Sequence, residues 1–330
     1  MLFRAVATAF LTLAALPATA ACVGVNFLDR LTDAQRATLE ASVVNMPYAE
    51  GLIWNAEKGA DQLTIVGTMH IYDPRLEDLR GQLSYAVANA DLVMLEATPE
   101  EEAALQELII SDPGRLFIVD GPTLPELLDE ATWEMVASAA TDRGIPSFMA
   151  AKMQPWYLSV SLAIPACAMD DILAGARGLD HMIIQDAEAA GTPMQALEPH
   201  TTLFDIFENE PVEEQISMLR VNMLIPELQQ QMFVAMLDRY FAEDIGRHWE
   251  MSRIALSNVP DLDPEEASVM FDEMSEAFLD LRNQRWIPVI DEATQTNDDI
   301  VIAVGAAHLI GDQGILQLLE NDGWTITRTK

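Results

Sequence analysis

Short apolar runs alternate with amphipathic stretches along much of the chain. Leu63–Gly67 and Asp91–Glu96 are rich in aliphatic residues and too short for typical helices, so they predict buried strands. Between them, a stretch from about Leu76 to Ala90 has helical periodicity. Strand, helix and strand in this order are typical of a parallel sheet with a helical crossover.

The same signals predict the remaining elements. Strands are expected over residues 116–119, 193–198, 300–305 and 324–327, and helices over 32–44, 124–140, after 155, over 178–191 and from about 312. From about 204 to 285 only helical periodicity is found, which predicts a helical layer or lid over the sheet. We therefore expect an α/β fold with a mostly parallel central sheet and helices on both faces; a mixed α+β arrangement is the alternative. No linker divides the chain, which favours a single domain over residues 21–330.

The first 20 residues have the features of a cleaved signal peptide. Arg4 precedes an apolar run too short to span a bilayer, and Ala18-Thr19-Ala20 is the small-x-small pattern that precedes a cleavage site. An uncleaved anchor or a lipid attached at Cys22 are the alternatives, but a lipoprotein favours an aliphatic residue where Thr19 stands. We expect a periplasmic or secreted protein without stable membrane insertion after cleavage.

The net charge limits which partners are expected, and the two cysteines bear on a possible disulfide. The formal net charge of −35 repels nucleic acid phosphates and anionic lipid headgroups, so neither is an expected partner. The two cysteines are Cys22 and Cys167. In an oxidising compartment they can form a disulfide that fixes the N-terminus, and the alternative is two unpaired thiols.

Polar side chains follow four of the predicted strands. His70, Glu96, Glu198 and His308 each stand at or just beyond a strand end, and the carboxyl ends of parallel strands meet at one edge of a sheet. Both histidines end a Gly-x-x-His motif. Because the chain has only five histidines in all, two at matched positions are a notable coincidence. Either histidine alone would more readily be a buried imidazole bonded to the backbone, but the matched pair favours function.

Two imidazoles and a carboxylate suit Zn, Mn, Fe or Co, with open positions for water and substrate. Such a metal lowers the pKa of bound water and produces a nucleophile near neutral pH. A metal-free site, in which a histidine activates water beside Glu96, stays open. The sequence lacks Gly-x-Ser-x-Gly, His-Glu-x-x-His, Cys-x-x-Cys and P-loop motifs. We interpret His181, His200 and His248 as surface or packing residues, and the scattered methionines as core residues rather than copper ligands.

The ordered series of short motifs resembles the TraB/GumN family over nearly all of the mature chain. The matching segments are Gly67-Thr68-Met69-His70, Leu95-Glu96, Gly178-Leu179-Asp180, Leu197-Glu198, Arg282-Asn283, and Gly305-Ala306-Ala307-His308-Leu309 with Gly311 and Gly314. Pro199-His200 is a departure, because the family more often has Thr after the Leu-Glu pair.

The resemblance implies an α/β fold related to the Tiki metalloproteases, the erythromycin esterases and the ChaN-like haem-binding proteins. It implies a metal-dependent peptidase site at His70, Glu96 and His308, with Mn, Co or Zn as cofactor and a peptide or protein as substrate. Supporting residues would be Glu198, Asp180, Arg75, Arg282 and Asn283. The alternatives are a binding protein that holds haem or a metal without turnover, and a role in surface polysaccharide production.

Overall fold

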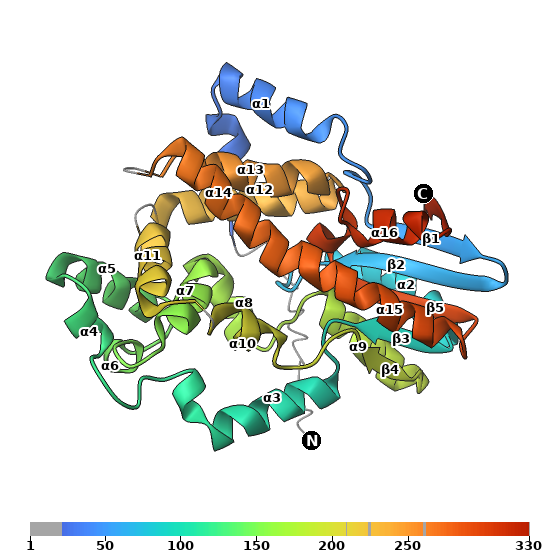
Figure 1. Cartoon of the computed structure of the whole chain (residues 1–330), viewed down its shortest axis with the longest axis horizontal. Helices are drawn as coiled ribbons and strands as arrows, with labels where there is room; N and C mark the ends of the chain where they lie inside the picture. Colours follow the sequence, from blue (N-terminus) through green and yellow to red (C-terminus); the bar gives the residue numbers. More distant parts are fainter. Residues whose placement is uncertain (1–21, 209, 224–225, 260–261, 330) are drawn as a thin grey trace, which may run out of the picture.

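The computed structural model describes residues 22–208, 210–223, 226–259 and 262–329, so the predicted signal peptide lies outside the described residues. Its centre is a six-stranded sheet of order β4-β3-β5-β2-β1-β6 (Figure 1). The strands are β1 (Ile53–Lys58), β2 (Asp61–Thr68), β3 (Leu92–Leu95), β4 (Met194–Ala196), β5 (Asp299–Gly305) and β6 (Thr325–Arg328).

Four neighbouring strands are parallel and form the buried part of the sheet. β5 pairs in parallel with β2 and with β3, and β3 pairs in parallel with β4. Ile300 to Val304 of β5 are fully or almost fully buried, as expected of a β-branched run covered on both faces. The α/β prediction with a mostly parallel sheet is therefore confirmed.

One strand was not predicted from the sequence. β1 is antiparallel to both β2 and β6, and Trp54 and Ala56 are buried while Asn55 and Glu57 are exposed. Its alternation of buried and exposed residues is that of a half-buried strand. The tight turn into β2 uses Gly59 at φ +71°, a conformation that favours glycine.

Helices cover both faces of the sheet (Figure 1). α2 (Leu76–Asn89) packs against α9 (Leu179–Ala190) on one face, and α15 (Leu281–Thr294) packs against α16 (Ile315–Asn321) on the other. A short 3-10 turn, η5 (Ala306–Leu309), follows β5 directly.

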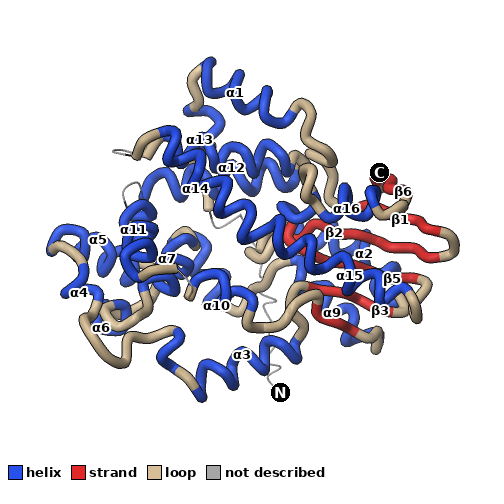
Figure 2. The backbone as a smooth tube through the Cα atoms, in the orientation of Figure 1, coloured by secondary structure: helices blue, strands red, loops and turns tan. Residues whose placement is uncertain are grey.

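A second group of helices lies to one side of the sheet (Figure 2). It comprises α3 (Pro99–Ser111), η2 (Pro113–Arg115), α4 (Leu124–Leu127), α5 (Glu130–Thr141), α6 (Ser147–Ala150), α7 (Pro155–Ala163), η3 (Ala166–Ala168), α8 (Met169–Leu173), α10 (Thr202–Phe207) and α11 (Val212–Met223). Much of this group shares a separate apolar core centred on Leu124, Leu158, Leu162 and Leu219.

The predicted strand over residues 116–119 is wrong. Only Phe117 forms a bridge, an isolated one with Met153, and this segment lies away from the sheet. Leu116 is instead buried among aromatic side chains of the helical group, including Trp156 and Phe204. A short run of apolar residues can be buried in a core between helices as well as in a sheet. The hydrophobic pattern alone therefore does not distinguish a strand from such a segment.

A third group of helices lies beyond the carboxyl ends of the parallel strands. It comprises η1 (Phe27–Arg30), α1 (Asp33–Val43), α12 (Pro226–Phe241), α13 (Ile245–Ser257) and α14 (Pro264–Ser275). The Tyr240 hydroxyl of α12 donates to the Gly67 carbonyl near the end of β2 at 2.9 Å. The expected helical layer is thus present, but α12–α14 stand at the carboxyl edge of the sheet, while α15 lies on a face beside α16.

α14 continues into α15 through a π-turn, η4 (Glu276–Asp280). A π-turn holds one more residue per turn than an α-helix, and such turns occur frequently at functional sites.

Cys22 and Cys167 form a disulfide, as the sequence suggested. The bond joins the first described residue to η3, with a Cα–Cα distance of 5.2 Å across 145 residues of sequence. It fixes the start of the described chain to the second helical group.

Within the described residues, no single helix has the length and apolar character of a membrane span. Two successive helices, Pro155–Ala163 and Ala166–Leu173, together reach the length and apolar character of a span, but they are bent by 72° relative to each other.

Candidate active site

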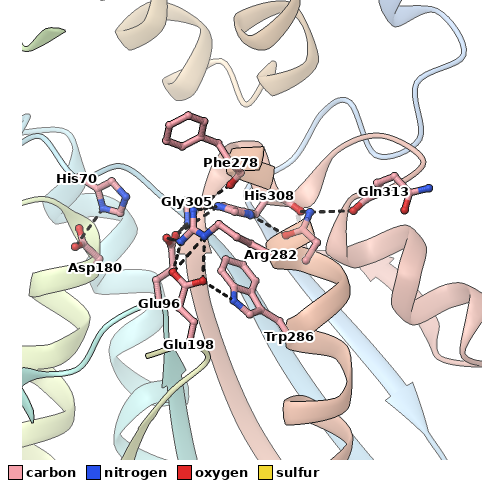
Figure 3. Close-up of polar contacts among 11 residues, drawn as sticks. His70, Glu96, Asp180, Glu198, Phe278, Arg282, Trp286, Gly305, His308 and Gln313 are labelled. Carbon is pink, nitrogen blue, oxygen red and sulfur yellow. Dashed lines mark hydrogen bonds and ion pairs between the residues drawn. The ribbon is translucent and has the colours of Figure 1, made fainter. Parts of the chain in front are cut away.

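The carboxyl edge of the parallel strands brings the two Gly-x-x-His motifs together (Figure 3). A Cβ atom built on Gly305 lies 3.3 Å from Glu96 Oε1, 3.6 Å from His308 Cδ2 and 3.8 Å from His70 Nε2. Three predicted site residues, which follow β2, β3 and β5, therefore lie together around Gly305, where a side chain would crowd Glu96.

Arg282 joins the acidic residues of this edge. Its Nη2 donates to Glu96 Oε2 and to Glu198 Oε1, each at 2.5 Å, and its Nε donates to Glu198 Oε2 at 3.0 Å. The side chains of Arg282, Glu96 and Glu198 are 7%, 18% and 11% exposed. One guanidinium thus compensates two largely buried carboxylates, which a bidentate, always charged arginine does better than a lysine.

The π-turn contributes to the position of Arg282. Nη1 donates to the Phe278 carbonyl oxygen at 3.1 Å, within the turn that precedes α15. The same Nη1 lies 3.1 Å from His308 Nε2. Arg282 is therefore held between its own helix and the strand ends.

Asn283 fixes the orientation of the His308 ring. Its Nδ2 donates to the Gln313 carbonyl at 2.9 Å and to the His308 carbonyl at 3.3 Å, which leaves Oδ1 as an acceptor 2.7 Å from His308 Nδ1. This network assigns the proton to Nδ1, so Nε2 carries a lone pair that faces Arg282.

The charges at the site follow from these contacts. Burial, together with the Arg282 charge, lowers the pKa of His308 to about 3, so its ring is neutral at neutral pH. Burial opposes ionisation of Glu96, but the two imidazoles, Arg282 and the Gly305 N–H lower its pKa to about 2. The Gly305 N–H donates to Glu96 Oε1 at 2.7 Å.

His70 stands at the side of this cluster, beside Asp180 (Figure 3). Its Nδ1 is 3.3 Å from Asp180 Oδ2, and its side chain is 62% exposed whereas that of Asp180 is 17% exposed. Desolvation opposes protonation of the ring, but the hydrogen bond and charge of Asp180 raise the pKa of His70 to about 9. His70 is therefore a cation at neutral pH, in contrast to His308.

The start of α9 holds the backbone of His70. Gly178 N donates to the His70 carbonyl at 3.1 Å, and Leu179 N donates to the Met69 carbonyl at 2.9 Å. A Cβ atom on Gly178 would lie 2.0 Å from the Met69 oxygen, so this contact requires glycine. The Gly178-Leu179-Asp180 segment thus positions both the backbone and the ring of His70.

Arg75 is one predicted supporting residue that the structure places elsewhere. Its guanidinium forms a bidentate pair with Asp73 at 2.8 Å and lies 3.9 Å from the Phe241 ring centroid. These contacts connect the start of α2 to α12, and no described contact joins Arg75 to the Glu96 cluster.

Two contacts of the site were not predicted from the sequence. The Trp286 indole N–H donates to Glu198 Oε2 at 3.1 Å, and a spacing of four residues from Arg282 on a helix is the signal that could have indicated it. His181, interpreted as a surface residue, lies 2.9 Å from both Asp180 and Glu102. No sequence pattern distinguishes His181 from other helical surface residues.

The arrangement does not fit the expected metal as it stands. Among the described residues, no group of three histidine, cysteine or acidic side chains could hold one metal ion. Arg282 takes the His308 Nε2 lone pair, which a metal would need, and it also binds Glu96 Oε2. The charge that neutralises these acids is the guanidinium itself.

The fold and the site define a class of protein: an α/β protein with a buried arginine–carboxylate cluster and two imidazoles at the carboxyl edge of its sheet. The model of the TraB/PrgY/gumN family matches residues 52–328, and the chain belongs to this family. The family prediction is thus confirmed, and the match includes both Gly-x-x-His motifs. No curated protein matches the chain.

Proposed function

We propose that the chain is an exported hydrolase that acts on peptide or protein substrates at the space over Gly305. The observation that carries the proposal is the convergence of Glu96 Oε1, the His308 ring and His70 Nε2 on that space, within 3.3 to 3.8 Å of a Cβ position on Gly305. A carboxylate and a cationic imidazole are groups suited to water activation and to charge stabilisation. The His308 ring borders them through Cδ2, while Asn283 and Arg282 engage its two nitrogens.

In this proposal, the residues have distinct roles. Protonated His70 donates from Nε2 to the carbonyl oxygen of the bond that is cleaved and stabilises the developing negative charge. Glu96 orients the attacking water, accepts its proton as the water oxygen bonds to the carbonyl carbon, and gives that proton to the amine nitrogen as the bond between carbon and nitrogen breaks. Because the pKa of Glu96 is about 2, it is a weak base, and most of the acceleration must come from the charge of His70.

Arg282, Glu198 and Asn283 are positioning residues in this proposal. Arg282 keeps Glu96 ionised and fixed, Glu198 holds Arg282 in place, and Asn283 keeps the His308 ring in one orientation. A loss of any of them should change the rate through the geometry of Glu96 or His308.

The free edge of β4 supports a peptide substrate. β4 ends the sheet, and a groove of about 410 Å³ lined by Met194–Pro199 and by Thr98, Glu100 and Glu101 of the α3 start leads along it to Glu198. An edge strand beside a groove can pair with the backbone of an extended peptide. Such a peptide would be led toward the carboxyl edge where the cluster lies.

A peptide library made by digesting a proteome tests the proposal. The purified mature chain, prepared without a metal-affinity tag, is expected to cleave a subset of peptides, as read by mass spectrometry. Glu96→Gln and His70→Gln are expected to reduce the rate by about 10²–10³-fold. His200→Gln, at a half-buried loop residue, is the matched control and should retain the activity.

The same preparation distinguishes the alternatives. If cleavage requires added Mn²⁺, Co²⁺ or Zn²⁺, and stoichiometric metal is lost in folded His70→Ala and His308→Ala variants, a metal displaces Arg282 and the metal-dependent form of the hydrolase is correct. A Soret band without cleavage would instead favour a haem-binding protein. No cleavage under any of these conditions contradicts the hydrolase proposal.

A further inference from the structure

A second pocket lies among the helices at the carboxyl edge, and its lining residues do not include the residues that follow the strands. α13 packs against both α12 and α14 (Figure 1). Residues of all three helices border a cavity of about 400 Å³. Its principal lining side chains are Met232, Met236, His248, Leu256, Phe271 and Met274. Cavities of this size lined by apolar side chains are typical of small-molecule sites.

The described lining of this α12–α14 pocket has no acidic or basic side chain other than His248. A charged ligand would lose its hydration there without gaining a partner of opposite charge. Three of the lining residues are methionines, whose flexible thioether chains adapt to ligands of varied shape. The pocket therefore selects a neutral and largely apolar occupant.

His248 adds a polar requirement. Its Nδ1 is buried and has no hydrogen-bond partner among the described residues. Burial lowers the pKa of His248 to about 4, so the ring is neutral and offers one donor and one acceptor at neutral pH. The ring as a whole is half-buried and lines the pocket, so a polar group of the ligand can reach it at Nε2, whereas Nδ1 is closed to solvent.

We propose that the α12–α14 pocket binds a small, neutral, largely apolar molecule that carries one hydroxyl or amide group. Its hydrocarbon part contacts the methionines and Phe271, and its polar group bonds to the His248 ring. This site is independent of the proposed hydrolase activity, because none of its lining residues belongs to the Glu96 cluster.

A neutral fluorescent amine, N-phenyl-1-naphthylamine, tests the proposal with the mature chain. Its fluorescence is expected to rise on saturable binding at one site. 1-Decanol should displace it, whereas decanoate and decyltrimethylammonium should require at least about tenfold higher concentrations, because they differ from decanol mainly in charge. Equal displacement by the charged compounds, or no saturable binding, overturns the proposal.

Variants locate the probe. Met232→Trp fills the pocket and is expected to weaken probe binding at least about tenfold, whereas Met218→Trp, on α11 and outside the lining, should bind as the wild type does. His248→Phe keeps an apolar wall but removes the ring nitrogens, so displacement by decanol should weaken about tenfold. Unchanged binding in folded Met232→Trp overturns the proposal. If that variant does not fold, as judged by circular dichroism, the competitor series on the wild-type chain remains decisive.

Discussion

At the scale of single residues, Arg282 has the largest structural consequence, because two largely buried carboxylates depend on it. Arg282→Met leaves Glu96 and Glu198 without their common partner. We expect a loss of about 3–5 kcal/mol in the free energy of unfolding at pH 7, measured by urea denaturation. The loss should shrink toward pH 4, because unpaired buried carboxylates become protonated more readily.

An exposed ion pair provides the control for Arg282. Lys58 and Asp322 are 2.7 Å apart, but their side chains are 43% and 40% exposed. Lys58→Met should therefore change the free energy of unfolding by no more than about 1 kcal/mol. Equal losses in the two variants would contradict the burial argument.

The pKa of His70 is expected to lie well above the ordinary value of a histidine. NMR titration of the five histidine rings should show one midpoint near pH 9, and Asp180→Asn should move it toward the ordinary value. Because the folded pKa is raised, the His70–Asp180 contact stabilises the fold below the unfolded pKa of about 6.5 and is lost as the pH rises through about 9. His200→Gln identifies one signal and should leave the others unchanged. A His70 midpoint near 6.5 in both proteins would show that the contact with Asp180 is absent.

At the scale of elements, the start of α9 and the end of β2 are in direct backbone contact. Gly178→Ala would place a methyl group 2.0 Å from the Met69 oxygen and force the two elements apart. We expect a loss of roughly 1–3 kcal/mol in the free energy of unfolding and a weaker His70–Asp180 contact. The measurements are urea denaturation and the His70 titration.

Gly81 is the matched control for this substitution. It lies inside α2, and a Cβ atom there has no neighbour within 4 Å among the described residues. Gly81→Ala should therefore stabilise the protein by about 0.5–1 kcal/mol, since glycine is unfavourable in a helix interior. A shift of the same sign in both variants would refute the steric interpretation.

The elements also show why some of the fold was predictable. β5 and β2 are short, largely buried and rich in β-branched residues, and such runs favour strands. Residues 116–119 have a similar apolar character but lie in a helical core, since burial and not strand pairing selects apolar residues. β1 was missed because only Trp54 and Ala56 face the core, which is a weak signal in six residues.

At the scale of the whole molecule, the disulfide connects the N-terminal segment to a helical group 145 residues away. Cys22→Ser combined with Cys167→Ala should lower the free energy of unfolding by about 2–5 kcal/mol, because the unfolded chain loses its longest constraint. Urea denaturation without reductant measures this loss. The wild type in reductant should match the double variant, and two reactive thiols in the untreated protein would show that the bond is absent.

The candidate site was predictable where it depends on strand topology and less so where it depends on helix placement. His70, Glu96, Glu198 and His308 follow parallel strands, and topology alone brings them to one edge. Arg282 lies between His308 and the carboxylates of Glu96 and Glu198 because of how α15 crosses the sheet. No local sequence pattern predicts the placement of that helix. Two imidazoles and a carboxylate predict metal ligands, and the metal stays a prediction. The guanidinium that lies among these groups becomes visible only in three dimensions.

The π-turn between α14 and α15 takes up one extra residue in one long helix. Deleting one residue within Glu276–Asp280 would restore regular α-helical winding and leave Arg282 in nearly the same rotational position relative to Phe271. The same deletion in the regular winding of α15 before Arg282 would instead rotate the arginine by about 100°. Related chains could therefore gain or lose a single residue at the π-turn and keep the arginine at the strand ends.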